Sequence, residues 1–169
     1  MYEQKFMDMV IDLSRKALTL PGTQPFGAIL VRNGVVIGEG LNHEIARHDP
    51  TSHGEIEAIR DACQRLETND LSDCTMYAIG EPCPMCTVAI RLAKISQVYY
   101  GASHLDAFNA YSGLSDTPYA DIGVEGLRAE AGTPVESRSI PYHCHEPEAC
   151  AAVYREWAVY MEKKLGMAD

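Results

Sequence analysis

His53-Gly54-Glu55 and, further along, Pro82-Cys83-Pro84-Met85-Cys86 are the two stretches that indicate most about the fold and chemistry of this chain, because their side chains suit one metal ion. One histidine and two cysteines are among the side chains that bind zinc in proteins. A tetrahedral Zn²⁺ with three protein ligands keeps its fourth position for water, which is typical of a catalytic site. The sequence therefore predicts one Zn²⁺ per chain, bound by His53, Cys83 and Cys86, with water as the fourth ligand.

Both motifs are expected at the beginnings of helices. Cys83 and Cys86 are three residues apart, so their sulfur atoms point to one side of a first helical turn, and Pro84 suits the first helical position. His53 lies near the start of a helix predicted over residues 52–66. The positive end of a helix dipole and a metal ion both lower the pKa of a thiol, which favours two thiolates. We therefore expect two helix N-termini to converge on the ion.

Glu55 follows the expected histidine ligand by two residues. On a regular helix that spacing keeps two side chains from being neighbours, but in a first turn they can lie on either side of a substrate pocket. A carboxylate in that place can take a proton from the water and deliver it to a substrate. We expect Glu55 to be the catalytic general acid and base.

Apolar strand-like runs alternate with helical periodicities along the rest of the chain. Asn33-Gly34 between two apolar runs is a strong hairpin signal, so the first two strands should be antiparallel. Alternating strands and helices are typical of a layered α/β domain, and the long interval before the last strand favours a parallel final pair. We expect a mixed five-stranded sheet with helices on both faces. The predicted strands are 26–31, 35–38, 75–79, 97–100 and 137–142, and the predicted helices are 3–18, 52–66, 84–93 and 147–165.

Size and composition favour a single domain over residues 1–169. Its 46% hydrophobic and 22% charged residues are ordinary for a globular protein. The apolar runs are too short to cross a bilayer and the first residues carry no export signal, so we expect no membrane partner and a cytoplasmic location. The 14 Lys and Arg against 24 Asp and Glu give a net charge of −10, which disfavours a nucleic-acid partner.

Two other interpretations of the cysteine pair stay open. A C-x-x-C pair also occurs in thiol–disulfide redox sites, which need no upstream histidine and carboxylate. A structural zinc site needs a fourth protein ligand, and His143-Cys144-His145 with Cys150 is the only candidate source. Without an export signal, the cysteines outside the pair are better explained as buried or free thiols than as disulfides.

The two motifs resemble the H-x-E and P-C-x-x-C signature of zinc-dependent base deaminases. From Pro25 to about Ala107 the chain is similar to the cytidine-deaminase-like superfamily of zinc hydrolases, and within it most resembles bacterial guanine deaminases. The stretches that carry this resemblance are Pro25-Phe26-Gly27-Ala28, Glu39-Gly40-Leu41-Asn42, Asp49-Pro50-Thr51-Ser52-His53, Glu57-Ala58-Ile59-Arg60, Glu81-Pro82-Cys83-Pro84-Met85-Cys86 and His104-Leu105-Asp106-Ala107.

The resemblance implies a three-layer α/β/α sandwich, a homodimer and the same zinc ligands and proton-shuttling carboxylate. It also implies that Asn42 and Phe26 hold the base by hydrogen bonding and ring packing. A further acidic residue is implied at the substrate, for which Asp116 is the nearest equivalent and Asp121 the second choice. Asp106 follows a strand end, where sites gather in open α/β sheets, and is another candidate for substrate contact.

The resulting hypothesis is a hydrolytic deaminase of a free nucleobase, with guanine converted to xanthine and ammonia. Deamination of another small heterocycle, such as cytosine, creatinine or a triazine, or of a nucleoside, would use the same chemistry with different pocket contacts. A tRNA adenosine deaminase would need a basic groove, and a non-enzymatic zinc module would need four protein ligands.

Overall fold

The computed structural model describes residues 1–111 and 123–165 of the chain. Its contacts divide the chain into two compact units, residues 1–131 and 132–169, so the single domain expected over residues 1–169 stays a prediction. None of the helices among the described residues combines the length and apolar character that a bilayer span requires.

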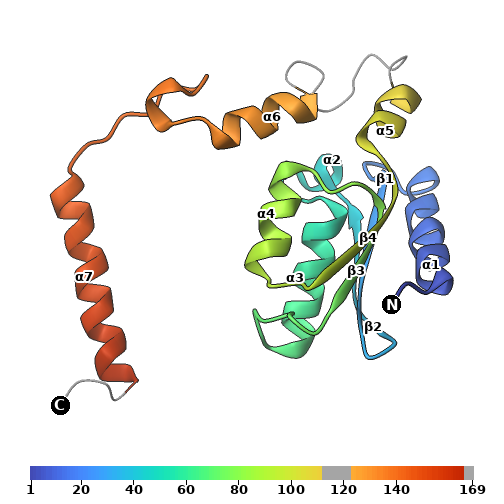
Figure 1. Ribbon diagram of the computed structural model, residues 1–169, viewed down its shortest axis with the longest axis horizontal. Coiled ribbons are helices and arrows are strands. Elements are labelled where there is room, and N and C mark those ends of the chain that lie inside the picture. The colour runs from blue at the N-terminus through green and yellow to red at the C-terminus, as the bar shows by residue number, and fades with distance from the viewer. Residues whose placement is uncertain (112–122, 166–169) are drawn as a thin grey trace. The chain divides into compact units, whose positions relative to one another are not determined.

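The first unit holds a sheet and most of the helices (Figure 1). In chain order its elements are α1 (Gln4–Arg15), the 3₁₀ turn η1 (Lys16–Leu18), β1 (Gln24–Arg32), β2 (Val35–Asn42), α2 (Glu44–Arg47), α3 (Gly54–Leu66), β3 (Thr75–Gly80), α4 (Pro84–Leu92), β4 (Gln97–Ala102), α5 (His104–Tyr111) and α6 (Gly123–Gly132). The second unit contains a 3₁₀ turn η2 (Val135–Ser137) and α7 (Pro147–Lys164). The four long predicted helices are thereby confirmed within a few residues at each end.

The sheet is mixed, as predicted, with the strand order β2-β1-β3-β4. β1 pairs antiparallel with both β2 and β3, whereas β3 and β4 are parallel and are joined through α4. Asn33 and Gly34 form the predicted hairpin turn, and both have positive φ angles, 51° and 76°. Two consecutive positive φ angles are those of a type I′ turn, whose twist matches that of the strands it joins.

The prediction of a fifth strand is wrong, because the described residues contain four strands. Residues 137–142 end the short turn η2 and then continue without regular secondary structure, so the expected parallel pairing with β4 is also wrong. Pro141 lies inside this segment and cannot donate a ladder hydrogen bond. The β-branched and aromatic residues around it suggested a strand, but pairing with a neighbour is what makes one.

Helices cover both faces of the sheet in three layers, with α1 on one face and α3 and α4 on the other (Figure 1). Each face has its own apolar core. The core under α1 is formed by Phe6, Met7, Val10, Ile29, Val31 and Tyr77. The core under α3 and α4 is formed by Ala28, Leu30, Ala58, Ala62, Leu71, Cys74, Met76, Ala78, Ile90, Ala93 and Ile95.

Small residues let α3 lie unusually close to β2. A Cβ atom added to Gly40 would lie 2.0 Å from the carbonyl oxygen of Gly54 and 2.4 Å from the backbone nitrogen of Ala58. At Gly38 it would lie 2.5 Å from the carbonyl oxygen of Ala58. The backbone of the helix therefore rests directly on the strand, and this contact places the first turn of α3 at one end of the sheet.

We expect Gly40→Ala to lower the free energy of unfolding by at least about 1–3 kcal/mol, because overpacking a tight contact forces backbone movement. Urea denaturation of the two proteins measures this difference. Gly132→Ala is the matched control, since no atom lies within 4 Å of a Cβ added there. Equal unfolding midpoints for Gly40→Ala and wild type would show that the two backbones are not in close contact.

Candidate metal centre

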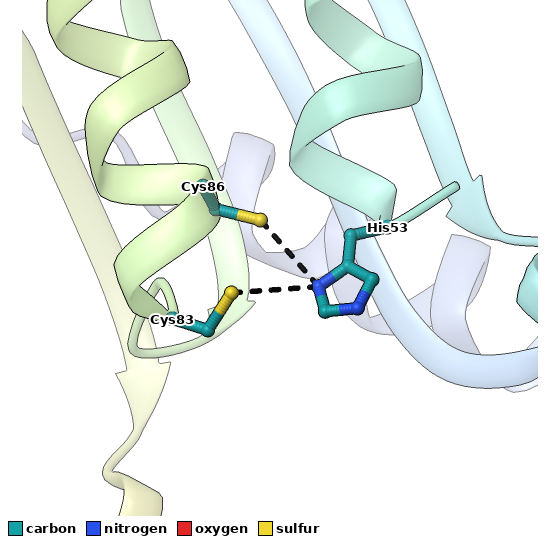
Figure 2. Close-up of side chains that lie close together, drawn as sticks. All are labelled: His53, Cys83 and Cys86. Carbon is teal, nitrogen blue, oxygen red and sulfur yellow. Dashed lines mark hydrogen bonds between the residues drawn. The ribbon is translucent and has the colours of Figure 1, made fainter. Parts of the chain in front are cut away.

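Three side chains from different parts of the chain meet with the geometry of a metal site (Figure 2). The Nδ1 atom of His53 lies 3.6 Å from Sγ of Cys83 and 3.5 Å from Sγ of Cys86. The three ligand atoms all lie within 4.8 Å of one another. Zinc–nitrogen and zinc–sulfur bonds of about 2.0 and 2.3 Å at a tetrahedral angle separate nitrogen from sulfur by about 3.5 Å. The cluster therefore has the size of one face of a zinc tetrahedron.

The ligands come from two helix N-termini, as the sequence predicted. His53 is the N-cap residue of α3 and Cys83 is the N-cap residue of α4, and both have extended backbone angles. Pro84 occupies the start of α4, and Cys86 lies fully buried in its first turn. Figure 2 shows the two sulfur atoms on α4 facing the imidazole at the start of α3.

The protonation of the cluster suits a cation. The Cys86 thiol donates a hydrogen bond to Cys83, which lowers the pKa of Cys83 to about 4 and raises that of Cys86 above its ordinary value. Burial alone would lower the pKa of His53, but its hydrogen bond to Cys83 raises it. Zinc ligands must be deprotonated, so a bound Zn²⁺ would displace the protons that these groups share. The donor set and its spacing therefore fit zinc.

Glu55 lies in the first turn of α3, and only 8% of its surface is exposed. Burial raises the pKa of its carboxyl, and the charge of Cys83 raises it further. Its carboxyl also lies within hydrogen-bonding reach of the Cys86 thiol, so Cys83 and Glu55 compete for the single proton of that thiol. Although Glu55 is only two residues from His53, both side chains reach the same cluster, because His53 precedes the helix and does not follow its rotation.

Two of the predicted substrate residues contact residues that adjoin this centre. Asn42 ends β2 and is 2% exposed, and its Oδ1 accepts a hydrogen bond of 3.0 Å from the backbone nitrogen of Glu44. Phe26 lies half-buried near the start of β1. A Cβ atom added to Gly54 would lie 2.2 Å from the carbonyl oxygen of Phe26, so this strand residue adjoins the first turn of α3.

Of the other predicted substrate residues, the described part of the chain includes only Asp106, and the hydrogen bonds described for it are made to Ser103 and not to the centre. Asp106 is exposed, and its Oδ2 accepts hydrogen bonds from the backbone nitrogen and the hydroxyl of Ser103 at 2.8 and 2.6 Å. The backbone nitrogen of Asp106 in turn donates to that hydroxyl, which completes a capping box at α5. Asp116 and Asp121 lie outside the described residues, and their roles stay predictions.

Sequence reasoning missed the residues that support the cysteine loop. The backbone nitrogen of Glu81 donates to the carbonyl oxygen of Ala102 at 2.8 Å, which joins the loop to the end of β4. The Glu81 side chain accepts hydrogen bonds from Arg128 at 2.9 Å and from the backbone nitrogen of His104 at 3.4 Å. Because the three residues are far apart in the chain, the only sequence signal was the place of Glu81 directly before Pro82-Cys83.

The alternative ligands near the C-terminus do not form a group of their own. Within the described part of the second unit, His143, Cys144, His145 and Cys150 include no cluster of three metal-ligating atoms. Both cysteines are exposed free thiols. Cys83 and Cys86 are also free, and both sulfurs lie beside the imidazole of His53, which a redox pair would not need.

Comparisons with known proteins agree with this geometry. Residues 1–102 match the family model of the cytidine and deoxycytidylate deaminase zinc-binding region. Over 164 residues the chain is 34% identical to a guanine deaminase of Bacillus subtilis (strain 168), covering 97% of this chain and 99% of that one. The X-ray structure of a Bacillus subtilis guanine deaminase is similar with a TM-score of 0.80, at 33% identity and 94% coverage of both chains. A tRNA-specific adenosine deaminase of Buchnera aphidicola is 41% identical over 102 residues, which are 60% of this chain and 62% of that one.

Loss of an outer partner of a zinc ligand weakens zinc binding by about 10- to 100-fold. Because Cys83 is a predicted ligand itself, we expect Cys83→Ser to weaken zinc binding by more than this. The fold should persist, because the two apolar cores do not include Cys83. Zinc content after dialysis and the circular dichroism of the purified protein check both parts. Cys150→Ser, at an exposed thiol, is the control. If Cys83→Ser unfolds along with its loss of zinc, the metal has a structural role.

Proposed function

Since this chain belongs to the cytidine and deoxycytidylate deaminase zinc-binding family, we propose that it is a zinc-dependent deaminase of a free nucleobase, guanine, which it hydrolyses to xanthine and ammonia. The observation that carries the choice of substrate is the extent of the similarity. The Bacillus subtilis guanine deaminase matches 97% of the chain, whereas the Buchnera tRNA-specific adenosine deaminase matches 60%. The residues beyond the shared zinc region therefore follow the guanine deaminase.

Charge supports the same choice. A tRNA substrate would be bound largely through its phosphates, and neutralising them requires a surface rich in Lys and Arg. The chain carries a net charge of −10. A free base has no phosphate, so an acidic protein can bind it through the polar edges and the faces of its rings.

In the reaction, water adds to the ring carbon that carries the amine, and the amine leaves as ammonia. When bound, a zinc ion with three protein ligands lowers the pKa of a water in its fourth position to about 7. Glu55 accepts a proton from the attacking water and delivers it to the adjacent ring nitrogen. It then carries the proton of the added hydroxyl to the amine, so that the carbon–oxygen double bond forms as the carbon–nitrogen bond breaks. A carboxyl whose pKa is raised by burial suits this role, because it can hold the proton between the two steps.

The substrate contacts are part of the proposal. The hydrogen bond from Glu44 orients the amide oxygen of Asn42 towards α2, so Asn42 offers its NH₂ group to an acceptor atom of the purine. Phe26 adjoins the start of α3 and would pack against the rings. Asp116 would accept hydrogen bonds from the ring N–H and amino donors, because an ionised carboxylate only accepts. Asp106 is a weaker candidate, since its carboxylate caps α5.

A homodimer and a cytoplasmic location, both expected from the sequence analysis, stay predictions. Light scattering of the purified protein measures its molar mass and so tests whether it is a homodimer.

We expect ammonia release with guanine to exceed that with cytosine, adenine, guanosine, creatinine and triazines by at least about 10-fold in kcat/KM. Each such factor corresponds to about 1.4 kcal/mol of transition-state binding. A coupled ammonia assay over this panel measures the ratio. Faster ammonia release from another compound of the panel would support deaminase activity but would assign that compound as the substrate.

We expect Glu55→Gln to lower kcat by about 10²- to 10⁴-fold with its zinc content unchanged, because glutamine cannot transfer a proton. Steady-state kinetics and metal analysis of the same sample check the two parts together. Glu39→Gln, at an exposed glutamate of β2, is the matched control and should keep its activity. Wild-type turnover by Glu55→Gln would exclude the mechanism.

A further inference from the structure

A second carboxylate, that of the half-buried Glu44, faces the imidazole of His53 on the Nε2 side of the ring, whereas the cysteines lie on the Nδ1 side. Its Oε2 lies 3.8 Å from Nε2 of His53, and the two side chains are 19% and 12% exposed. The same Oε2 atom is buried without a hydrogen-bond partner among the residues that the structure describes. Burying a carboxylate oxygen without a hydrogen-bond donor costs free energy, so a nearby N–H group that donates to this atom would stabilise it.

The tautomer that zinc requires supplies that N–H group. Nδ1 of His53 is the nitrogen that faces Cys83 and Cys86, at 3.6 and 3.5 Å. A nitrogen that binds a metal must offer its lone pair, so the proton of a neutral imidazole is then on Nε2. Nε2 is the nitrogen nearest to Glu44, and a movement of about 1 Å brings Oε2 within hydrogen-bond distance.

We propose that Glu44 is a positioning residue of the metal centre, whose carboxylate accepts a hydrogen bond from Nε2–H of His53 and so holds Nδ1 toward the ion. A partner of this kind fixes the ring orientation of a zinc-binding histidine and makes the ligand more basic. The inference rests on the zinc site of the proposed function but not on the identity of the substrate.

The backbone around α2 holds Glu44 in this place. The amide oxygen of Asn42 accepts a hydrogen bond of 3.0 Å from the backbone nitrogen of Glu44. One residue further back, the nitrogen of His43 donates to the carbonyl oxygen of Ser52 at 2.9 Å, directly before the ligand. The nitrogen of Ala46 donates to Gly22 at 2.9 Å. These bonds join the short helix to the end of β2 and to the residue before His53.

Side chains also tie α2 to α3. Arg47 at the end of α2 forms an ion pair with Glu57 of α3. The hydroxyl of Ser52 donates to Glu57 at 3.0 Å, and Arg60 pairs with the same carboxylate at 2.7 Å. These contacts keep α2 beside the first turn of α3 without involving the side chain of Glu44. Removal of that side chain should therefore leave the local backbone in place.

The arrangement connects a substrate residue with a metal ligand. Asn42 holds the backbone of Glu44, and the side chain of Glu44 faces His53. A base that binds to Asn42 would therefore contact the segment that holds Glu44, whose carboxylate orients the imidazole of His53.

The test measures zinc affinity by competition with a chelator, without substrate, for wild type, Glu44→Ala and Glu44→Gln. We expect Glu44→Ala to weaken zinc binding by about 10- to 100-fold, as is usual for loss of such a partner. Glu44→Gln should recover at least part of this loss, because its amide oxygen can still accept the hydrogen bond from Nε2–H. Glu39→Ala, at an exposed glutamate, is the control and should bind zinc as wild type does.

A second measurement separates positioning from folding. When Co²⁺ replaces zinc, the visible absorption spectrum of Glu44→Ala should differ from that of wild type. The urea unfolding midpoints of the two metal-free proteins should be equal. Wild-type zinc affinity in Glu44→Ala, or an affinity loss accompanied by a lower urea midpoint, would overturn the proposal. If the wild-type protein turns over no guanine but these zinc results hold, the substrate assignment fails and the role of Glu44 stands. If wild type binds no zinc, both fail.

Discussion

The metal centre, on which the arrangement of the other site residues depends, has one geometric requirement: an imidazole nitrogen and two sulfur atoms must lie at the corners of a single small tetrahedron. The 3.5 and 3.6 Å separations between Nδ1 of His53 and the two sulfurs satisfy it. To achieve this, the N-termini of α3 and α4 must meet at one end of the sheet. The close packing of α3 on Gly38 and Gly40 of β2 holds the first helix, and the parallel connection from β3 through α4 to β4 places the second.

The same convergence explains the electrostatics of the site. Cys83, Cys86 and Glu55 gather beside one histidine in a buried place, and without a cation they must share protons. A divalent ion would offset the charge of two thiolates and would leave the carboxylate of Glu55 for the proposed proton transfer. Burial, which is unfavourable for an isolated carboxylate, here supplies the raised pKa that a proton carrier needs.

Much of the fold and of the centre could be predicted, because the relevant signals are local. Asn33-Gly34 predicts a hairpin through the backbone angles that its turn requires, and Pro84 between two cysteines predicts a helix start. The prediction of a strand at 137–142 was wrong because strand formation depends on a partner that no local pattern reveals. Glu44 was missed because it is one of 24 acidic residues, and nothing in its neighbourhood distinguishes it.

By itself, the sequence determined the chemistry of this protein: the identity and spacing of the zinc ligands, the carboxylate beside them and the helix starts that carry them. These properties follow from short-range geometry, which a few adjacent residues contain in full. Only the tertiary structure decided which distant groups stand around that chemistry, such as Glu44 behind His53 or Glu81 between Arg128 and His104. Those contacts join different elements of the fold, and their distances are set by how the helices pack on the sheet.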